Sequence, residues 1–189
     1  MWREAEDKLQ TDKFIGPLIQ KWGSCTIKPL KEHQYFEDLI DAICSQQLSI
    51  RAAKTIFGRV KDLLAKITPE NILSKTDQEL RDCGLSWQKV SYIKDLATKT
   101  ANGELQVKKL DKLNDEEIIT ELVKVKGIGK WTAEMFLMFT LGRADILPND
   151  DLGINKALKN LKIKKKDTEK WKPFRTVASW YLWRSLESK

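Results

Sequence analysis

Apolar side chains recur at helical spacing along most of the chain, and this periodicity most restricts the possible folds. Phe36, Leu39, Ile40 and Ile43 follow the i, i+3, i+4, i+7 pattern, which places one apolar stripe on a single helix face. Similar stripes occur within residues 53–60, 90–97, 118–122 and 177–181. No segment alternates apolar and polar residues as a half-buried strand does. The sequence therefore predicts an all-α fold of about nine or ten short helices in two lobes.

Residues typical of helix ends support these assignments. Ser49 precedes the stripe at 53–60 and can cap that helix, whereas Thr76 and Glu79 have the spacing of a capping box. Asn114 begins a similar pattern before residues 118–122. Pro173 suits the first turn of the last helix. The helix boundaries are therefore marked by local sequence as well as by periodicity.

The length and composition favour one compact unit. The chain has 189 residues, of which 41% are hydrophobic and 32% charged, with no linker rich in Gly, Pro or Ser. A chain of this size buries roughly 70% of its unfolded surface and is stable without disulfides or metals. We therefore expect a single domain over residues 1–189. The longest apolar run, at 135–141, is far shorter than the roughly 18 residues of a membrane span, and the charged start lacks the apolar core of a signal peptide. These features predict an intracellular protein.

The cysteine and histidine content excludes several kinds of site. Cys25, Cys44 and Cys83 are widely spaced and odd in number, so they form neither a disulfide framework nor a four-cysteine cluster. His33 is the only histidine, which excludes the usual zinc enzymes and most Ser-His-Asp catalysis. Any enzymatic chemistry must therefore depend on carboxylates, lysines or tyrosines.

The net charge of +7 is concentrated in the last third of the chain. Residues 1–119 contain 19 Lys/Arg and 19 Asp/Glu, whereas residues 120–189 contain 15 Lys/Arg and 8 Asp/Glu. Such one-sided basicity is typical of a protein that binds a polyanion such as nucleic acid. A solvated lysine-rich helical face is the alternative.

A glycine-rich turn between two expected helices is a candidate anion site. Gly127 and Gly129 bracket Ile128, which allows a tight hairpin with positive φ angles in which Ile128 fills the groove between the flanking helices. The turn presents backbone amides at a helix N-terminus, and Lys126 and Lys130 flank it. A phosphate would fit such a site, although an ordinary helix–helix turn has the same pattern.

Four separated motifs, taken together, resemble a known family. The segment 122–133 resembles a helix-hairpin-helix DNA-binding motif, which we expect over about residues 115–141. About 20 residues further on, Pro148, Asp150 and Asp151 resemble the aspartate-containing loop of the helix-hairpin-helix (HhH-GPD) DNA glycosylase superfamily. Residues 42–49 and 173–184 extend the resemblance, which is most specific to the 3-methyladenine DNA glycosylase II, or alkylbase glycosylase, branch. The resemblance implies the compact multi-helix fold of that superfamily, with the active site between two lobes and no additional N-terminal β domain.

The resemblance implies a catalytic role for Asp151. Breaking a base–sugar bond gives the sugar oxocarbenium character, and a nearby carboxylate stabilises this cation while it orients or deprotonates water. Asp151 is also expected at the start of the helix through Ile154, where free amides favour negative charge. Without the family resemblance, Asp151 could equally be a helix N-cap with no chemistry, and the role of Asp150 stays open.

Trp131 stands where bifunctional relatives carry a lysine nucleophile. Lys130 is one position away, about 100° around the helix, so the resemblance implies a monofunctional enzyme without AP-lyase activity. Trp131 is expected in the base pocket, where its ring would attract a cationic N-alkylated purine. Tyr35 and Trp87 are further candidates for this pocket. Each of these three aromatic residues could instead pack in the core.

The remaining expectations concern DNA. The family resemblance implies extrusion of the damaged nucleotide with Gln47 as the intercalating wedge, although Gln47 could be only a polar helix-end residue. Binding of the DNA backbone is assigned to Lys126, Gly127, Ile128, Gly129, Lys130 and Thr132. The resemblance also implies a structural Na⁺ or K⁺ at the backbone carbonyls of Val125 and Gly127, with no cofactor needed for catalysis.

The sequence thus predicts a monomeric enzyme that releases 3-methyladenine or 7-methylguanine from double-stranded DNA, in the nucleoid, cytoplasm or nucleus. Such bases are already cationic and leave without a general acid. Two alternatives remain at this point. One is a glycosylase for neutral bases such as hypoxanthine or uracil, which would need a proton donor. The other is a non-catalytic DNA-binding module.

Overall fold

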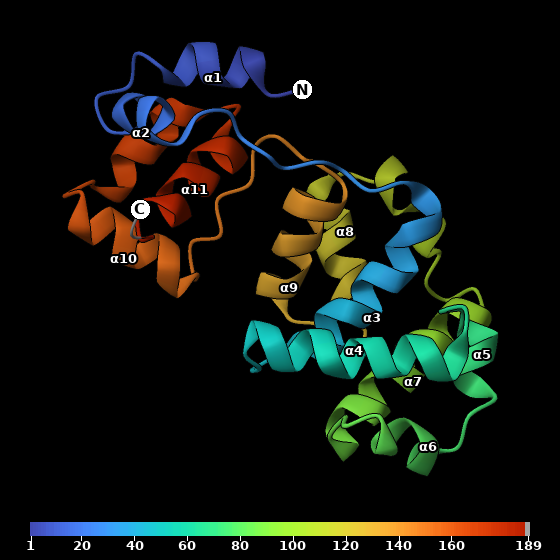
Figure 1. Cartoon of the computed structure of the whole chain (residues 1–189). Helices are drawn as coiled ribbons and strands as arrows, with labels where there is room; N and C mark the ends of the chain where they lie inside the picture. The colour runs from blue at the N-terminus through green and yellow to red at the C-terminus, as the bar shows by residue number, and fades with distance from the viewer. Residues whose placement is uncertain (188–189) are drawn as a thin grey trace. The chain divides into compact units, whose positions relative to one another are not determined.

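The computed structural model describes residues 1–187, and all the regular elements in that part of the chain are helices (Figure 1). The chain divides into two compact units. The central unit is Leu30–Phe136, and the terminal unit combines Met1–Pro29 with the chain from Leu137 onward. The all-α prediction is confirmed, and the two units match the two expected lobes. That they make one domain stays a prediction.

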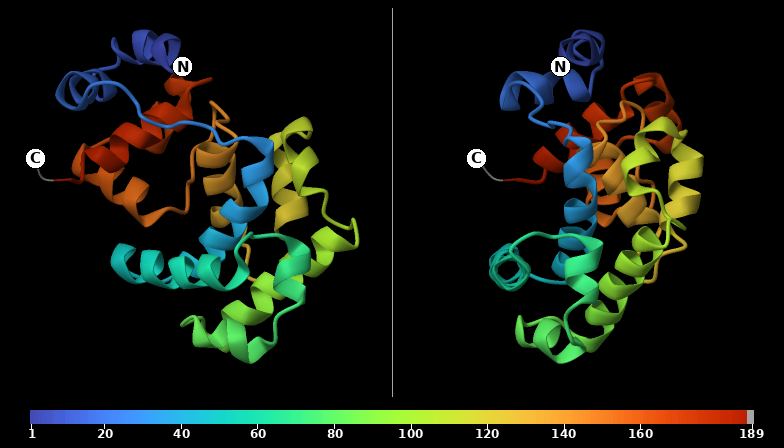
Figure 2. Two further views of the ribbon diagram at one scale, coloured as in Figure 1. Left: turned by 45° about the vertical axis from the view of Figure 1, so that its right-hand side comes forward. Right: turned by 90° about the vertical axis from the view of Figure 1, so that its right-hand side faces the viewer.

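The central unit has seven α-helices within the described residues. They are α3 (Tyr35–Ser45), α4 (Ile50–Leu64), α5 (Pro69–Leu73), α6 (Asp77–Asp82), α7 (Trp87–Ala101), α8 (Asp115–Leu122) and α9 (Lys130–Met135), with 3-10 turns at Glu32–Gln34 and Val107–Lys112. In both views of Figure 2, α4 runs crosswise to α3. The predicted apolar stripes form the core, because Leu39, Ile43, Ile93 and Leu122 are all fully buried.

The terminal unit is assembled from both ends of the chain. A π-helical turn, Phe136–Thr140, leads out of the central unit. The other elements are α1 (Arg3–Leu9), α2 (Ile15–Trp22), α10 (Leu152–Asn160), a 3-10 turn at Lys165–Trp171 and α11 (Arg175–Arg184). Helix α11 packs against α1, α2 and α10, and its Tyr181 and Leu182 are fully buried. This packing ties the C-terminal helices to the first two helices of the chain.

The helix ends agree with the sequence at several positions. Ser49 caps α4, and Thr76 and Asn114 each form the expected capping box. Helix α11 begins at Arg175 rather than at Pro173, because Phe174 has the non-helical backbone of its N-cap. None of the helices among residues 1–187 is long and apolar enough to cross a membrane.

Candidate functional site

The hairpin, residues 123–129, connects α8 to α9 in the central unit and requires glycine at one position. Gly127 has φ +81°, and a Cβ atom there would lie 2.0 Å from the ring of Tyr92. Both the conformation and the close contact therefore exclude a side chain. The expected positive φ is not found at Gly129, where φ is −94° and ψ is 175°. Gly129 is extended because it is the N-cap of α9.

Ile128 fills the interior of the hairpin, as expected. Its side chain is 4% exposed, and its amide donates a 3.1 Å hydrogen bond to the carbonyl oxygen of Val125. Val125 and Leu122 are also buried. The turn is therefore anchored from within, while Lys126, Gly129 and Lys130 stay exposed.

The start of α9 has the features of an anion site. Gly129 makes no side-chain capping bond, and the first amides of a helix lack intrahelical acceptors. Lys126 and Lys130 are exposed beside these amides, and Lys130 Nζ lies 3.8 Å from a carboxylate oxygen of Glu134. The Thr132 side chain is buried, so this residue can offer its backbone amide to a phosphate rather than its hydroxyl.

Asp95 of α7 fixes the hairpin from the side. Its Oδ2 accepts a 2.9 Å hydrogen bond from the Lys126 amide, and its Oδ1 accepts a 2.8 Å bond from Lys99 Nζ. Burial raises the pKa of Asp95, but the hydrogen bonds from Lys99 and Lys126 outweigh burial and hold the pKa below its usual range. Asp95 therefore stays charged and keeps the Lys126 amide in place.

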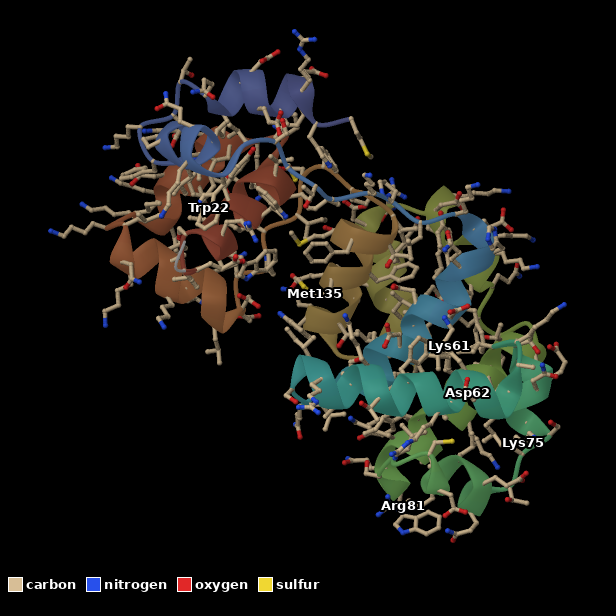
Figure 3. The ribbon with its side chains drawn as sticks, in the orientation of Figure 1. Trp22, Lys61, Asp62, Lys75, Arg81 and Met135 are labelled. Carbon is tan, nitrogen blue, oxygen red and sulfur yellow. The ribbon has the colours of Figure 1, made fainter. Side chains whose placement is uncertain are left out.

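A groove of about 710 Å³ in the central unit lies against the hairpin. Trp131 of α9 lines it and is 47% exposed. Met135, on the same helix in Figure 3, also lines the groove. Gln47 lines it from the loop after α3 and has a positive φ of 57°. Residues other than glycine adopt that conformation rarely, and in the described chain Ala65 and Lys162 share it with Gln47.

The other two aromatic candidates do not line this groove. Tyr35 is 6% exposed and packs edge-on against Phe136, with ring centroids 5.8 Å apart. Trp87 is 56% exposed at the start of α7 and lies beside Arg81 of α6, which Figure 3 labels. The structure thus brings Trp131 and Gln47 together but places neither Tyr35 nor Trp87 with them.

Asp151 begins α10 in the terminal unit, as the sequence predicts. Its Oδ1 accepts a 2.7 Å hydrogen bond from the Ile154 amide and a 2.9 Å bond from Trp183 Nε1. A Cβ atom on Gly153 would lie 2.9 Å from the Trp183 ring and 3.0 Å from Asp151 Oδ1, so this close packing needs a glycine. Both hydrogen bonds fix the orientation of the Asp151 side chain.

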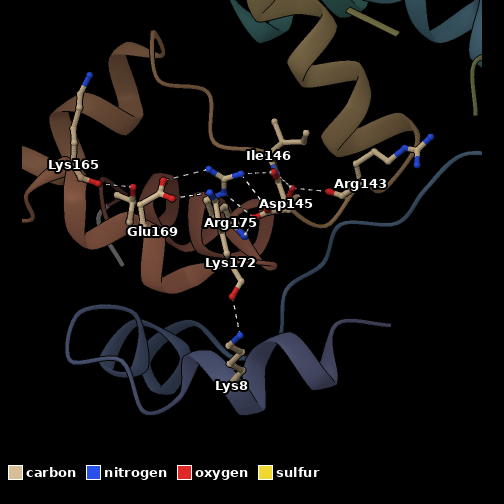
Figure 4. A network of polar contacts seen from close by, with 10 residues as sticks. Lys8, Arg143, Asp145, Ile146, Lys165, Glu169, Lys172 and Arg175 are labelled. Carbon is tan, nitrogen blue, oxygen red and sulfur yellow. Dashed lines mark hydrogen bonds and ion pairs between the residues drawn. The ribbon is translucent and has the colours of Figure 1, made fainter. Parts of the chain in front are cut away.

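The loop before Asp151 is anchored by α11. Arg175 Nε donates a 2.7 Å hydrogen bond to Asp145 Oδ1, and Arg175 Nη2 donates a 2.9 Å bond to Oδ2 (Figure 4). The Thr176 hydroxyl donates to the Arg143 carbonyl oxygen and accepts from the Ile146 amide. These bonds restrain the chain that leads to Asp151.

Sequence reasoning missed two residues that support the candidate site. The sequence does not single out Trp183, whose contact with Asp151 spans 32 positions. Gln46, the neighbour of the predicted wedge Gln47, donates a 2.8 Å hydrogen bond to the Gly127 carbonyl oxygen. The paired glutamines were a signal for Gln46, whereas no local pattern indicates Trp183.

Comparison with known proteins gives a consistent result. A family model described as HhH-GPD superfamily base excision DNA repair protein matches residues 40–180. DNA-3-methyladenine glycosylase 1 of Schizosaccharomyces pombe is 37% identical over 171 residues, which cover 84% of this chain and 75% of that protein. An alkylbase DNA glycosidase-like protein of the same organism is 35% identical over 96% of this chain and 92% of its own length.

A solved structure extends the likeness to three dimensions. The Schizosaccharomyces pombe 3-methyladenine DNA glycosylase in complex with abasic DNA has a TM-score of 0.81 and 34% sequence identity, and the match covers 96% of both chains. The likeness therefore extends over nearly the whole length of both chains.

Proposed function

Since the chain belongs to the HhH-GPD superfamily of base excision DNA repair proteins, we propose that it is a DNA glycosylase for N-alkylated purines. Its substrates would be bases of the 3-methyladenine and 7-methylguanine type in double-stranded DNA, and its product an abasic site. The observation that carries this proposal is Asp151, which follows the hairpin in the order of the family motif and is held as an oriented carboxylate by Ile154 and Trp183.

The first step in this proposal is extrusion of the damaged nucleotide. The hairpin amides and the flanking Lys126 and Lys130 would bind a backbone phosphate. A glycosylase cannot reach the bond inside a stacked duplex, so the nucleotide must rotate out at a cost of a few kcal/mol. Gln47 is the residue proposed to fill the resulting gap, and its exposure and strained backbone support this role.

The second step is hydrolysis of the bond between the base and the sugar. The purine leaves with the electron pair of the N-glycosidic bond, which neutralises the positive charge that alkylation placed on its ring. The sugar gains oxocarbenium character, and the Asp151 carboxylate stabilises it. Water adds to the anomeric carbon and gives up a proton, for which Asp151 is the proposed acceptor. No general acid is required, because the leaving base is already cationic.

Trp131 supports both the substrate class and the monofunctional assignment. An exposed tryptophan face attracts a cationic purine more strongly than a neutral one. An indole also cannot form the Schiff base on which AP-lyase chemistry depends. The neighbouring Lys130 is about 100° around the helix from Trp131, and its ammonium group lies near the Glu134 carboxylate. We therefore propose hydrolysis without strand cleavage.

A monovalent cation in the hairpin is part of the proposal. The Val125 carbonyl accepts one hydrogen bond from Ile128, and the Gly127 carbonyl accepts one from Gln46. A carbonyl oxygen has two lone pairs, so each keeps one for a Na⁺ or K⁺ ion. Such an ion would support the turn and neutralise a DNA phosphate. The proposed enzyme acts as a monomer inside the cell, where genomic DNA is present.

Base release from methylated duplex DNA tests the proposed function. The protein is expected to release free 3-methyladenine or 7-methylguanine, with strand breaks only after alkali treatment. Breaks without alkali would contradict the argument from Trp131. Tight DNA binding without release of any base would instead indicate a DNA-binding module.

A further inference from the structure

The loop that carries Gln47 is attached to two other elements of the central unit. This wedge loop, residues 46–48, follows the last turn of α3. Lys89 of α7 donates 2.7 Å hydrogen bonds from Nζ to the carbonyl oxygens of Cys44 and Gln46. Gln46 Nε2 in turn donates a 2.8 Å hydrogen bond to the Gly127 carbonyl oxygen in the hairpin. One continuous chain of contacts therefore links α7, the wedge loop and the hairpin.

Lys89 supplies a charge that α3 lacks. The last carbonyls of a helix have no intrahelical donor and carry partial negative charge, so a cation is favourable there. Helix α3 has no basic residue in its own last turn. Lys89, in the first turn of α7, reaches across and binds two carbonyl oxygens at that end.

The ammonium group of Lys89 is directed at the backbone and not at a competing anion. Burial raises the pKa of the Cys44 thiol to about 12, so the sulfur beside Lys89 stays uncharged at neutral pH. Burial lowers the pKa of Lys89 itself, because the group is partly removed from water. The two hydrogen bonds to carbonyl oxygens offset part of the cost of removing this charge from water.

The wedge loop needs such restraint because its backbone is strained. Gln47 has φ +57°, which costs of order 1 kcal/mol for a residue other than glycine. Gln46, the residue before Gln47, is held at both its carbonyl oxygen, by Lys89, and its side chain, by Gly127. These two hydrogen bonds keep the chain in that conformation. The groove against the hairpin is lined by Gln46, Gln47, Lys89 and Gly127, so the wedge loop and the side chains that restrain it border the same groove.

We propose that Lys89 and Gln46 are positioning residues, which fix the wedge loop to the hairpin. Gln47 is then correctly placed to enter the duplex when the hairpin binds the phosphate backbone. This inference rests on the proposed function. Neither residue is assigned to the bond-breaking step. Their contribution is to lower the barrier to extrusion of a paired nucleotide.

The proposal is tested with two duplexes that carry the same 7-methylguanine. In one duplex the lesion is paired with cytosine, and in the other it faces an abasic site, where extrusion costs less. Lys89→Met is expected to lower the single-turnover rate on the paired lesion by about tenfold, equivalent to about 1.4 kcal/mol, and by less than about threefold on the unpaired one. Lys89→Arg retains the charge and the donors and is expected to restore most of the rate.

Matched variants exclude a general effect on folding. Lys94 lies on the same helix and pairs with Asp77. Lys94→Met should change the rate on neither the paired nor the unpaired lesion. Gln46→Glu keeps the shape of the side chain but removes the donor to Gly127, so it should reproduce the selective loss even where Lys89→Met folds poorly. The two substitutions together should cost less than the product of their separate effects, because they interrupt one linkage.

The outcomes separate this inference from the proposed function. No base release by the unaltered protein from either duplex would overturn the glycosylase assignment and the inference with it. Release by the unaltered protein, with equal losses on both duplexes for Lys89→Met and Gln46→Glu, would overturn only the positioning role. Unchanged rates in both variants would do the same.

Discussion

At the scale of single residues, Asp151 shows which features of a site can be predicted from the neighbouring sequence. Its position before an apolar helical stretch made the N-cap predictable, and the structure confirms its bond to the Ile154 amide. The second partner, Trp183, was not predictable, because residues 32 positions apart meet only through the packing of α10 against α11. A sequence pattern can thus indicate a carboxylate, but the groups that orient it come from the tertiary structure.

Trp131 is expected to contribute to recognition of cationic bases. Trp131→Ala should lower kcat/KM for release of 7-methylguanine by about tenfold, since a desolvated cation–π contact contributes up to about 2 kcal/mol. The measurement is base release under conditions where substrate is limiting. Trp87→Ala is the matched control, because Trp87 is similarly exposed but lies outside the groove, and it should stay within about twofold of the unaltered protein. Equal losses in both variants would contradict the placement of the base at Trp131.

At the scale of elements, helices with a clear apolar stripe or cap were predictable, and the others were not. Apolar stripes predicted α3, α4, α7, α8 and α11, a capping box predicted α6, and the glycine pattern predicted the hairpin. The sequence did not indicate α1, α2 or α5. Helix α2 begins with Ile15, Gly16 and Pro17, of which the glycine disfavours a helix. A Cβ at position 16 would lie 2.3 Å from the Gln10 carbonyl oxygen, so tertiary contact explains this glycine.

The two hairpin glycines are expected to differ in their tolerance of substitution. Gly127→Ala would place a methyl group against Tyr92 in a left-handed conformation, so we expect a loss of roughly 1–3 kcal/mol in the free energy of unfolding. Gly129→Ala has open space and an extended backbone and should cost less than about 1 kcal/mol. Urea unfolding of both variants measures the difference. Equal stability would show that the hairpin adopts another conformation.

At the scale of the whole molecule, charge is divided unevenly between the two units. The terminal unit, counted to Lys189, has 17 Lys/Arg and 10 Asp/Glu, whereas the central unit has 17 of each. The net charge of +7 therefore belongs to the terminal unit, although the hairpin lies in the neutral central unit. The sequence located the charge in the last third of the chain, but its assignment to one unit required the fold.

This charge distribution predicts which lysines control the salt dependence of DNA binding. Replacing the three exposed lysines at 164–166 with glutamine should reduce the slope of log K against log salt by up to about 3, because each phosphate contact releases roughly one counterion. The same change at Lys108, Lys109 and Lys112 of the central unit is the control and should leave the slope nearly unchanged. Fluorescence anisotropy with an undamaged duplex measures both. A larger reduction of the slope by the changes at Lys108, Lys109 and Lys112 would contradict this prediction and indicate that the central unit makes the phosphate contacts.

The central claim is that Asp151 performs the bond-breaking step, and Asp151→Asn tests it most directly. Asparagine caps a helix about as well as aspartate, so the fold and the affinity for DNA should persist. The charge that stabilises the oxocarbenium ion is lost, and single-turnover release of 7-methylguanine should fall by about a hundredfold or more. Release by Asp151→Asn at the rate of the unaltered protein, at equal DNA occupancy, would contradict the account.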